Sequence, residues 1–348
     1  MYLSNEHILT LRFLEGFGTV TVNSIAEYIL ESRTPIADLN DLYVVLTELY
    51  EAKRITGSAR KFFPDKEALK QAYSQALFTL EKSDSLSIKM VSRFDSAFPS
   101  HLLSTVDESG KTAVPLYLFY KGNLAITQKP AVAIIGTREP TPEGVAAGKY
   151  IASAFAKGGF NIVSGLAVGC DTSGHEGALS VPGGLTTAIM AHGLDSVYPP
   201  QNTRLAESIV ANGGLLMSEY PIGTGVNKYN LVARDRLQAA LSDALIVIQT
   251  SINGGTMHAV NAALAAGKPL YAVTYSKPIP AEKIEGNSFL KEKKGAIGLS
   301  APSVQETISI LLNYTHTIPP FVPGYSLVRE KHGEQDNQLE QRFGTSKK

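Results

Sequence analysis

Apolar runs alternate with helical patterns between residues 130 and about 275. Short runs rich in β-branched residues, such as AVAIIG, FNIVSG and ALIVIQ, are separated by stretches such as NTRLAESIVANG, in which apolar positions recur at helical spacing. Continuous apolar runs of this length are typical of strands buried on both faces, and their alternation with helices favours a parallel sheet. The pattern predicts an α/β fold with a doubly wound parallel sheet.

The flanking segments have different patterns. Residues 1–80 carry apolar positions at helical spacing, as in VNSIAEYILES, and predict a small helical N-terminal domain. Residues 81–300 form the predicted second domain, with its core at 130–275 and a strand-like PLYLFY before a Gly-Asn turn signal. Residues 301–348 form a predicted C-terminal tail that is partly disordered, because EKHGEQDNQLEQRFGTSKK is strongly polar.

Charge and composition limit the partners and the location. The chain has 348 residues, and its 32 Lys and Arg balance 32 Asp and Glu, so a nucleic-acid site must be a local basic patch. The single cysteine, Cys170, excludes an intramolecular disulfide and suits a reducing compartment. No run approaches the roughly 18 apolar residues of a spanning helix, and the N-terminus lacks signal-peptide features. We therefore expect a cytoplasmic protein with no membrane partner.

Glycines and hydroxyl residues follow the ends of several predicted strands. Carboxyl ends of parallel strands meet at one edge of a sheet, where ligands bind. Glycine lets the backbone approach a phosphate, a hydroxyl donates to it, and arginine can clamp it. The residues that predict a phosphate-binding edge are Gly136, Thr137, Arg138, Ser164, Gly165, Gly169, Gly254, Gly255 and Thr256.

Three further arginines are candidates for the same site. Arg234 and Arg236 lie on a helical pattern and either contact phosphate or pair with nearby aspartates. Exposed ion pairs contribute only about 0–1 kcal/mol, so we favour contact with DNA or a nucleotide. Arg204, at a predicted helix start, fits a phosphate contact and a solvated surface position equally well.

Asp171 and His175 lie four residues apart at the start of a predicted helix, and so share one face. They suit either acid–base chemistry or, as we prefer, a capping aspartate and a hydrogen-bonded structural histidine. His192 and His258 are interpreted as structural. No two histidines and a carboxylate have metal-ligand spacing, so we predict no metal, and no cofactor is expected.

Two tyrosines and two missing motifs complete the candidate chemistry. Tyr198 and Tyr220 either stack on bases or pack under their own Tyr-Pro turns. Gly136 is not followed by G-x-x-G, which argues against a dinucleotide site, and no G-x-x-x-x-G-K-[ST] motif indicates a P-loop. We predict no catalytic constellation.

Several motifs, in order, resemble one family. SGLAVGCDTSGHEGAL, GLDSVYPPQN, SEYPIGTG and the stretch from NLVARDRLQAAL to AAGKPLYAV are similar to the DNA-processing protein A family, DprA, also called Smf. The resemblance covers about residues 90–300. It implies an extended Rossmann-like fold that binds single-stranded DNA as a homodimer and hands the strand to a RecA-type recombinase. It implies no established catalysis.

The chain departs from that family at several places, which include Thr274-Tyr275 in place of the usual Pro-Gly after the last strand. Gly136-Thr137-Arg138 replaces G-S-R, and Arg234-Asp235-Arg236 replaces R-N-R, which sets a carboxylate between two cations. The segment 253–256, Asn-Gly-Gly-Thr, is more similar to the wider nucleotide-binding superfamily that contains the phosphoribohydrolases. These changes indicate a divergent branch.

Two functions follow as hypotheses. The first is a DprA-type protein that holds single-stranded DNA by its phosphates and assists recombinase loading in DNA processing, transformation or recombination. The alternative is a nucleotide sensor or phosphoribohydrolase-like enzyme, in which Glu219 or Asp171 would act on an N-glycosidic bond. A role in anti-phage defence stays open.

Overall fold

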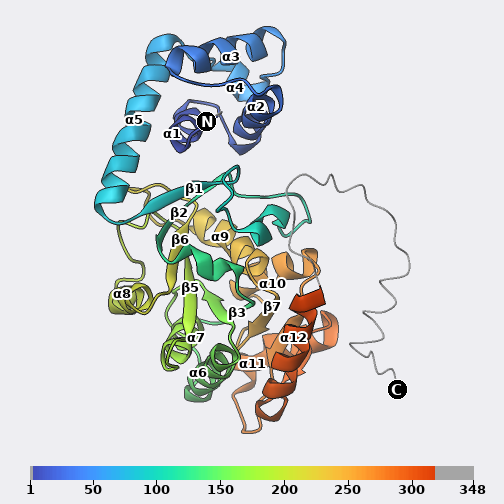
Figure 1. The fold of residues 1–348 in the computed structure, drawn as a ribbon. Coiled ribbons are helices and arrows are strands. Elements are labelled where there is room, and N and C mark those ends of the chain that lie inside the picture. The colour runs from blue at the N-terminus through green and yellow to red at the C-terminus, as the bar shows by residue number, and fades with distance from the viewer. Residues whose placement is uncertain (1–2, 318–348) are drawn as a thin grey trace. The chain divides into compact units, whose positions relative to one another are not determined.

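The computed structural model describes residues 3–317, and its N-terminal part is helical (Figure 1). Ser4 caps the first helix by accepting from the backbone N–H of His7, and Asp38 and Asp65 cap two later helices in the same way. The buried apolar faces of these helices meet in one core with Leu116 of the following domain. The helices are α1 Asn5–Phe13, α2 Thr19–Ser32, α3 Leu39–Glu51, α4 Gly57–Lys61 and α5 Lys66–Ser85.

A sheet of nine strands runs through the described residues, in the order β1-β2-β6-β5-β4-β3-β7-β8-β9. β1 and β2 are antiparallel to their neighbours, and β3 to β9 pair in parallel. The strands are β1 Lys89–Ser92, β2 Tyr117–Gly122, β3 Ala131–Ile135, β4 Asn161–Ser164, β5 Leu185–Met190, β6 Leu215–Ser218, β7 Ala244–Val247, β8 Leu270–Val273 and β9 Ile297–Leu299. This confirms the predicted α/β class and its parallel sheet.

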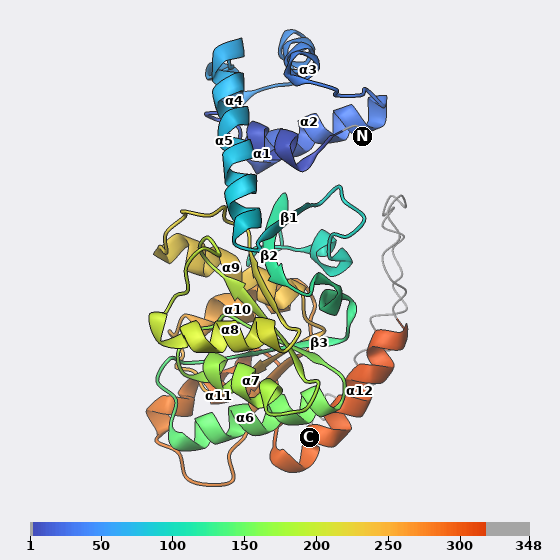
Figure 2. The ribbon, with the colours of Figure 1, turned by 60° about the vertical axis from the view of Figure 1, so that its left-hand side comes forward.

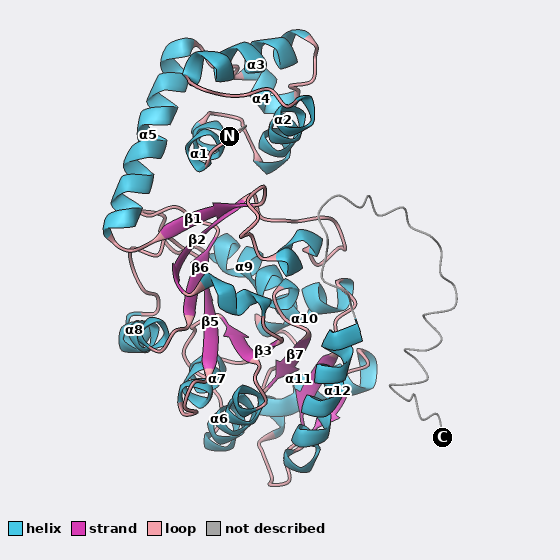
Figure 3. Cartoon of the chain, viewed as in Figure 1, coloured by secondary structure: helices cyan, strands magenta, loops and turns pink. Residues whose placement is uncertain are grey.

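Helices cover both faces of this sheet (Figures 2 and 3). Along β3, Val132 and Ile134 join a core with α6, α7 and α12, whereas Ala133 and Ile135 join a core with α9, α10 and α11. Successive strand side chains point to opposite faces, so a strand covered twice must be apolar throughout. These helices are α6 Pro142–Lys157, α7 Cys170–Leu179, α8 Thr203–Ala211, α9 Lys228–Ala240, α10 Thr256–Ala265, α11 Ala281–Lys293 and α12 Val304–Thr317, and the 3₁₀ turns are Ser100–Ser104, Leu124–Gln128, Pro200–Asn202 and Ala301–Ser303.

The order of the strands reverses at β3. The chain builds β4, β5 and β6 on one side of β3 and then places β7, β8 and β9 on the other side. Loops that leave β3 and β7 therefore diverge at their carboxyl ends and open a crevice between them. This topological switch point positions the candidate site.

The predicted tail begins with ordered structure. Val304, Ile308 and Leu311 of α12 are buried in the core that contains α6. The segment EKHGEQDNQLEQRFGTSKK, which we predict to be disordered, lies outside the described residues. No helix within residues 3–317 is both long and apolar enough to cross a membrane.

Candidate functional site

A groove of about 490 Å³ lies at the switch point. The loop after β3, the loop after β7 and the first turns of α9 and α10 line it. The groove brings together seven of the predicted site residues, namely Gly136, Thr137, Arg138, Arg234, Gly254, Gly255 and Thr256. The sequence pattern thus located the edge of the sheet at which these loops converge.

Two of the predicted glycines allow neighbouring loops to pack closely against each other, rather than exposing backbone N–H groups to a ligand. Gly169 has φ +88°, and a Cβ there would stand 2.6 Å from the carbonyl oxygens of Thr137 and Arg138. A Cβ on Gly136 would stand 2.6 Å from Sγ of Cys170. The backbone N–H of Cys170 donates to the carbonyl of Thr137 at 3.1 Å, which fixes the loop after β3 against the start of α7. These glycines set the shape of the groove wall.

Gly169→Ala should therefore destabilise the protein by about 2 kcal/mol or more, because alanine is strained at this φ and its Cβ meets two carbonyl oxygens. Gly255→Ala is the matched control, since nothing lies within 4 Å of a Cβ there and its φ is −57°. Urea unfolding of both variants measures the effect. Equal stability of the two variants would contradict this role for Gly169.

Arg234 lies beneath the groove and is 6% exposed. Its Nη1 donates to the carbonyls of Gly165, at 2.8 Å, and Ile189, at 2.5 Å, and its Nε pairs with Asp235 at 3.0 Å. Its guanidinium fills the space where a Cβ of Gly165 would stand. Gly165 thus admits an internal arginine, and Arg234 ties the ends of β4 and β5 together.

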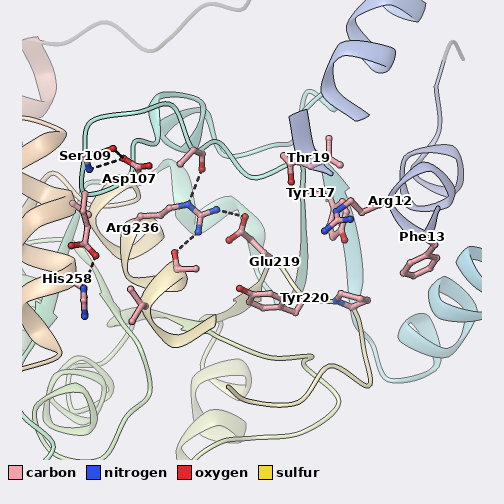
Figure 4. A pocket seen from close by; sticks show the side chains of 17 residues that line it. Arg12, Phe13, Thr19, Asp107, Ser109, Tyr117, Glu219, Tyr220, Arg236 and His258 are labelled. Atoms are coloured by element: carbon pink, nitrogen blue, oxygen red, sulfur yellow. Dashed lines mark hydrogen bonds and ion pairs between the residues drawn. The ribbon is translucent and has the colours of Figure 1, made fainter. Parts of the chain in front are cut away.

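The remaining predicted residues lie apart from the groove lining. Ser164 is buried and donates to the carbonyl of Ile134 at 2.6 Å. Arg236 faces a different cavity, where it pairs with Glu219 at 2.6 Å (Figure 4). Arg204 is exposed on α8 and lines neither cavity. Arg234 and Arg236 therefore do not act as a pair at one site.

Two cations at the groove have no partner among the described residues. The exposed side chains of Arg138, after β3, and Lys228, the first residue of α9, form no hydrogen bond or ion pair there. The sequence reasoning missed Lys228. A signal was present, because the positive end of the helix dipole disfavours a lysine in the first turn unless an anion binds nearby.

Aromatic side chains lie beside these cations. Tyr229, next to Lys228, is 87% exposed, and Tyr198 is 41% exposed in a neighbouring hollow that Arg138 and Arg234 also line. Sequence reasoning identified Tyr198 and missed Tyr229. An exposed aromatic ring beside a free cation is suited to stacking on a base.

Asp171 and His175 form hydrogen bonds inside the protein. Asp171 accepts from the backbone N–H groups of Gly165, at 3.1 Å, and Ala167, at 3.3 Å, so it holds the preceding loop rather than capping α7. Burial raises the pKa of Asp171 to about 6, although nearby Arg234 opposes the shift. The two side chains use different partners, because His175 bonds to Thr186 at 2.7 Å. The capping role predicted for Asp171 is therefore wrong, whereas the hydrogen bonds of both side chains agree with a structural role.

His258 lies at the rim of the groove, where its Nδ1 is 2.7 Å from Glu108. His192 is buried, and its Nδ1 bonds to the carbonyl of Gly193 at 2.8 Å. Within residues 3–317, no group of three His, Cys, Asp or Glu side chains is placed to hold a metal ion.

A model of the DNA recombination-mediator protein A family matches residues 89–309. The chain belongs to this family. The match confirms the predicted resemblance to DprA/Smf, which was placed at about residues 90–300. It covers the whole parallel sheet and the groove but leaves α1 to α5 outside.

Individual DprA and Smf proteins agree with this assignment. Protein Smf of Synechocystis sp. is 43% identical over 147 residues, which are 41% of this chain and 36% of that protein. Protein Smf of Escherichia coli is 31% identical over 222 residues, 64% of this chain and 56% of that protein. The chain thus matches between about a third and just over half the length of these relatives.

Solved DprA structures share the fold. The X-ray structure of DprA from Streptococcus pneumoniae covers 88% of this chain and 98% of its own, with a TM-score of 0.68 and 26% identity. DprA from Helicobacter pylori, described for its single-stranded DNA binding mode, covers 65% of this chain and 96% of its own, with a TM-score of 0.55 and 31% identity.

Proposed function

We propose that this DprA-family protein binds single-stranded DNA by its phosphates along the groove at the β3–β7 switch point. The proposal rests on two cations, Arg138 and Lys228, which reach the groove from different elements and have no partner within residues 3–317. Long charged side chains without a partner gain nothing from the fold itself, so an external anion explains their convergence.

The side chains around the groove favour binding of single-stranded DNA over binding of a duplex. Tyr229 and Tyr198 offer exposed ring faces, and unpaired bases can stack on such faces whatever their sequence. The related protein from H. pylori, 31% identical, is described as binding single-stranded DNA. Phosphate contacts with flanking rings predict tight, salt-dependent binding with little sequence preference.

The double variant Arg138→Ala/Lys228→Ala should weaken oligonucleotide binding about tenfold or more at moderate salt, because each lost contact is a charge-assisted hydrogen bond. The loss should be uniform across sequences, and the salt slope should fall by about 1.4, or about 0.7 per lost phosphate contact. Fluorescence anisotropy with labelled dT and mixed-sequence oligonucleotides at several salt concentrations measures both quantities.

Lys157→Ala is the matched control, because this exposed lysine ends α6 at the opposite edge of the sheet. Its affinity should equal that of the wild type. Unchanged affinity and salt slope in the double variant would refute the groove as the DNA site.

The enzyme alternative receives less support. Its proposed acid–base groups are separated, because Glu219 lines the other cavity and is paired with Arg236. Asp171 does line the groove, but two backbone N–H groups occupy its Oδ2. Glu139 also lines the groove, and its exposed carboxylate has no partner among the described residues, but neither of the two carboxylates proposed for catalysis is free in the groove.

We further propose, on family membership alone, that the protein acts as a homodimer and assists a RecA-type recombinase in DNA processing. Sedimentation of the full chain tests the dimer. Assembly of RecA on strands that this protein already covers tests the handover, and slower assembly than on naked DNA would contradict it.

A further inference from the structure

A second cavity, of about 740 Å³, lies between the helical N-terminal part and the α/β part (Figure 4). α1 and α2 line one side of it, and β2, the segment after β6 and α9 line the other. It shares only Val232 and His258 with the DNA groove. Its size and mixed lining are typical of small-molecule sites, and neither the fold nor the proposed DNA binding accounts for it.

At one end of this cavity lies a tyrosine hydroxyl that has no hydrogen-bond partner among the described residues. Tyr117 is 7% exposed, yet its hydroxyl, which faces the cavity, forms no hydrogen bond with any described residue. Burial raises the pKa of Tyr117 to about 12, the positive charge of Arg12 opposes this shift, and Glu219 adds to it. A hydroxyl that faces a cavity from a largely buried side chain, with no partner among the described residues, is free to bond to a ligand there.

The same end of the cavity is electropositive. Arg12 donates one hydrogen bond, from Nη1 to the carbonyl of Phe17, and has no carboxylate partner in the part of the chain that the structure describes. Thr19 begins α2, whose N-cap, Gly18, provides no side-chain cap for the first backbone N–H groups. A guanidinium, a phenol hydroxyl and a helix N-terminus together suit a phosphate.

The other charged side chains of the cavity form hydrogen bonds or ion pairs with its own residues. Arg236 holds Glu219, and His258 is 2.7 Å from Glu108. Asp107 accepts from Ser109 and from the backbone N–H of Lys111. Among the described residues that line the cavity, Arg12 is therefore the cation without a carboxylate partner, which favours an anionic group at its end of the cavity.

A planar polar group fits beyond the phosphate end. Arg236 fixes Glu219 by one oxygen, and the second oxygen has no hydrogen bond within the described residues. The ring of Tyr220 lies beside it (Figure 4). A free carboxylate oxygen next to an aromatic ring accepts from an exocyclic amine or ring N–H of a stacked base.

We propose that this cavity binds a nucleoside 5′-monophosphate, with its phosphate at Arg12 and Tyr117. The base lies against Tyr220 and donates to Glu219. A free nucleotide and the 5′-phosphorylated end of a strand present the same chemistry. Such a site lets a nucleotide join the helical part to the domain that carries the DNA groove.

Isothermal titration of the full chain with the four 2′-deoxynucleoside 5′-monophosphates tests the site, with the matching nucleosides, inorganic phosphate and a 5′-phosphorylated trinucleotide as comparison probes. At least one monophosphate should bind about tenfold more tightly than its nucleoside. Tyr117→Phe should weaken that binding about tenfold without lowering thermal stability, because the hydroxyl has no internal partner. Tyr271→Phe, a buried tyrosine on β8, should bind as the wild type does.

Two controls separate this site from the DNA groove. Arg138→Ala/Lys228→Ala should keep monophosphate binding, even if oligonucleotide binding at the groove is lost or never occurs. Tighter binding of the trinucleotide than of every monophosphate would identify a strand end as the ligand. Binding that survives Tyr117→Phe unchanged, or that only the groove variant abolishes, would overturn the proposal, as would no binding of any monophosphate.

Discussion

Arg234→Met should lower the free energy of unfolding by about 3–5 kcal/mol, the range seen when one partner of a buried ion pair is removed. The guanidinium is almost fully buried, and it satisfies the carbonyls of Gly165 and Ile189 as well as Asp235. Methionine fills similar volume but leaves the two carbonyls without this donor, and it leaves the largely buried carboxylate of Asp235 with Gln238 as a donor but without its counter-ion. Urea unfolding at pH 7 measures the loss.

A surface arginine provides the control for this experiment. Arg204→Met, on the exposed side of α8, should change stability by no more than about 0.5 kcal/mol. A loss below 1 kcal/mol for Arg234→Met would show that Arg234 does not hold the ends of β4 and β5. It would then be available to DNA, as the sequence analysis supposed.

Acidification should destabilise the protein through His175 by about 2 kcal/mol between pH 6.5 and 5. Thr186 donates its hydroxyl hydrogen to the carbonyl of Ile162, so Nδ1 of His175 must donate to Thr186. Nε2 of His175 is buried and has no partner among residues 3–317, so protonating it would bury an N–H without an acceptor there. Burial accordingly lowers the pKa of His175 from 6.5 to about 3.

The sign of the effect follows from proton linkage. Above pH 6.5, His175 is neutral in both states, and its contribution to stability is complete. Below pH 6.5 the unfolded chain binds a proton that the folded protein does not, which costs about 1.4 kcal/mol per pH unit until pH approaches 3. Comparing urea unfolding of the wild type with His175→Asn across pH isolates this group, because asparagine does not titrate.

Asp171 should have the opposite pH dependence. Its pKa is raised to about 6, so the folded protein binds a proton before the unfolded chain does as the pH falls from 6 toward 3.8. The stability of the wild type relative to Asp171→Asn should therefore increase over that range.

A stability difference between wild type and His175→Asn that stays constant from pH 6.5 to 5 would contradict the proposed environment of His175.

Periodicity was sufficient to predict the sheet. Runs such as AVAIIG and ALIVIQ became β3 and β7 because a strand covered on both faces must be apolar at every position. The place of the groove also followed from sequence, since the carboxyl ends of parallel strands lie at one edge. The helical N-terminal part and the family motifs were visible for the same reason, because each depends on local spacing.

Which side chains remain free at that edge was decided by the tertiary structure. Arg234 and Arg236 are two positions apart on α9, about 200° around the helix, so one enters the core while the other faces a different cavity. Gly165 lies against Arg234 rather than against open space, a contact that joins residues 69 positions apart. Sequence determined the elements and the edge of the sheet at which a ligand can bind, because those depend on local patterns. Only packing between distant segments decided which cations stay unpaired, because a charge is free when no distant partner reaches it.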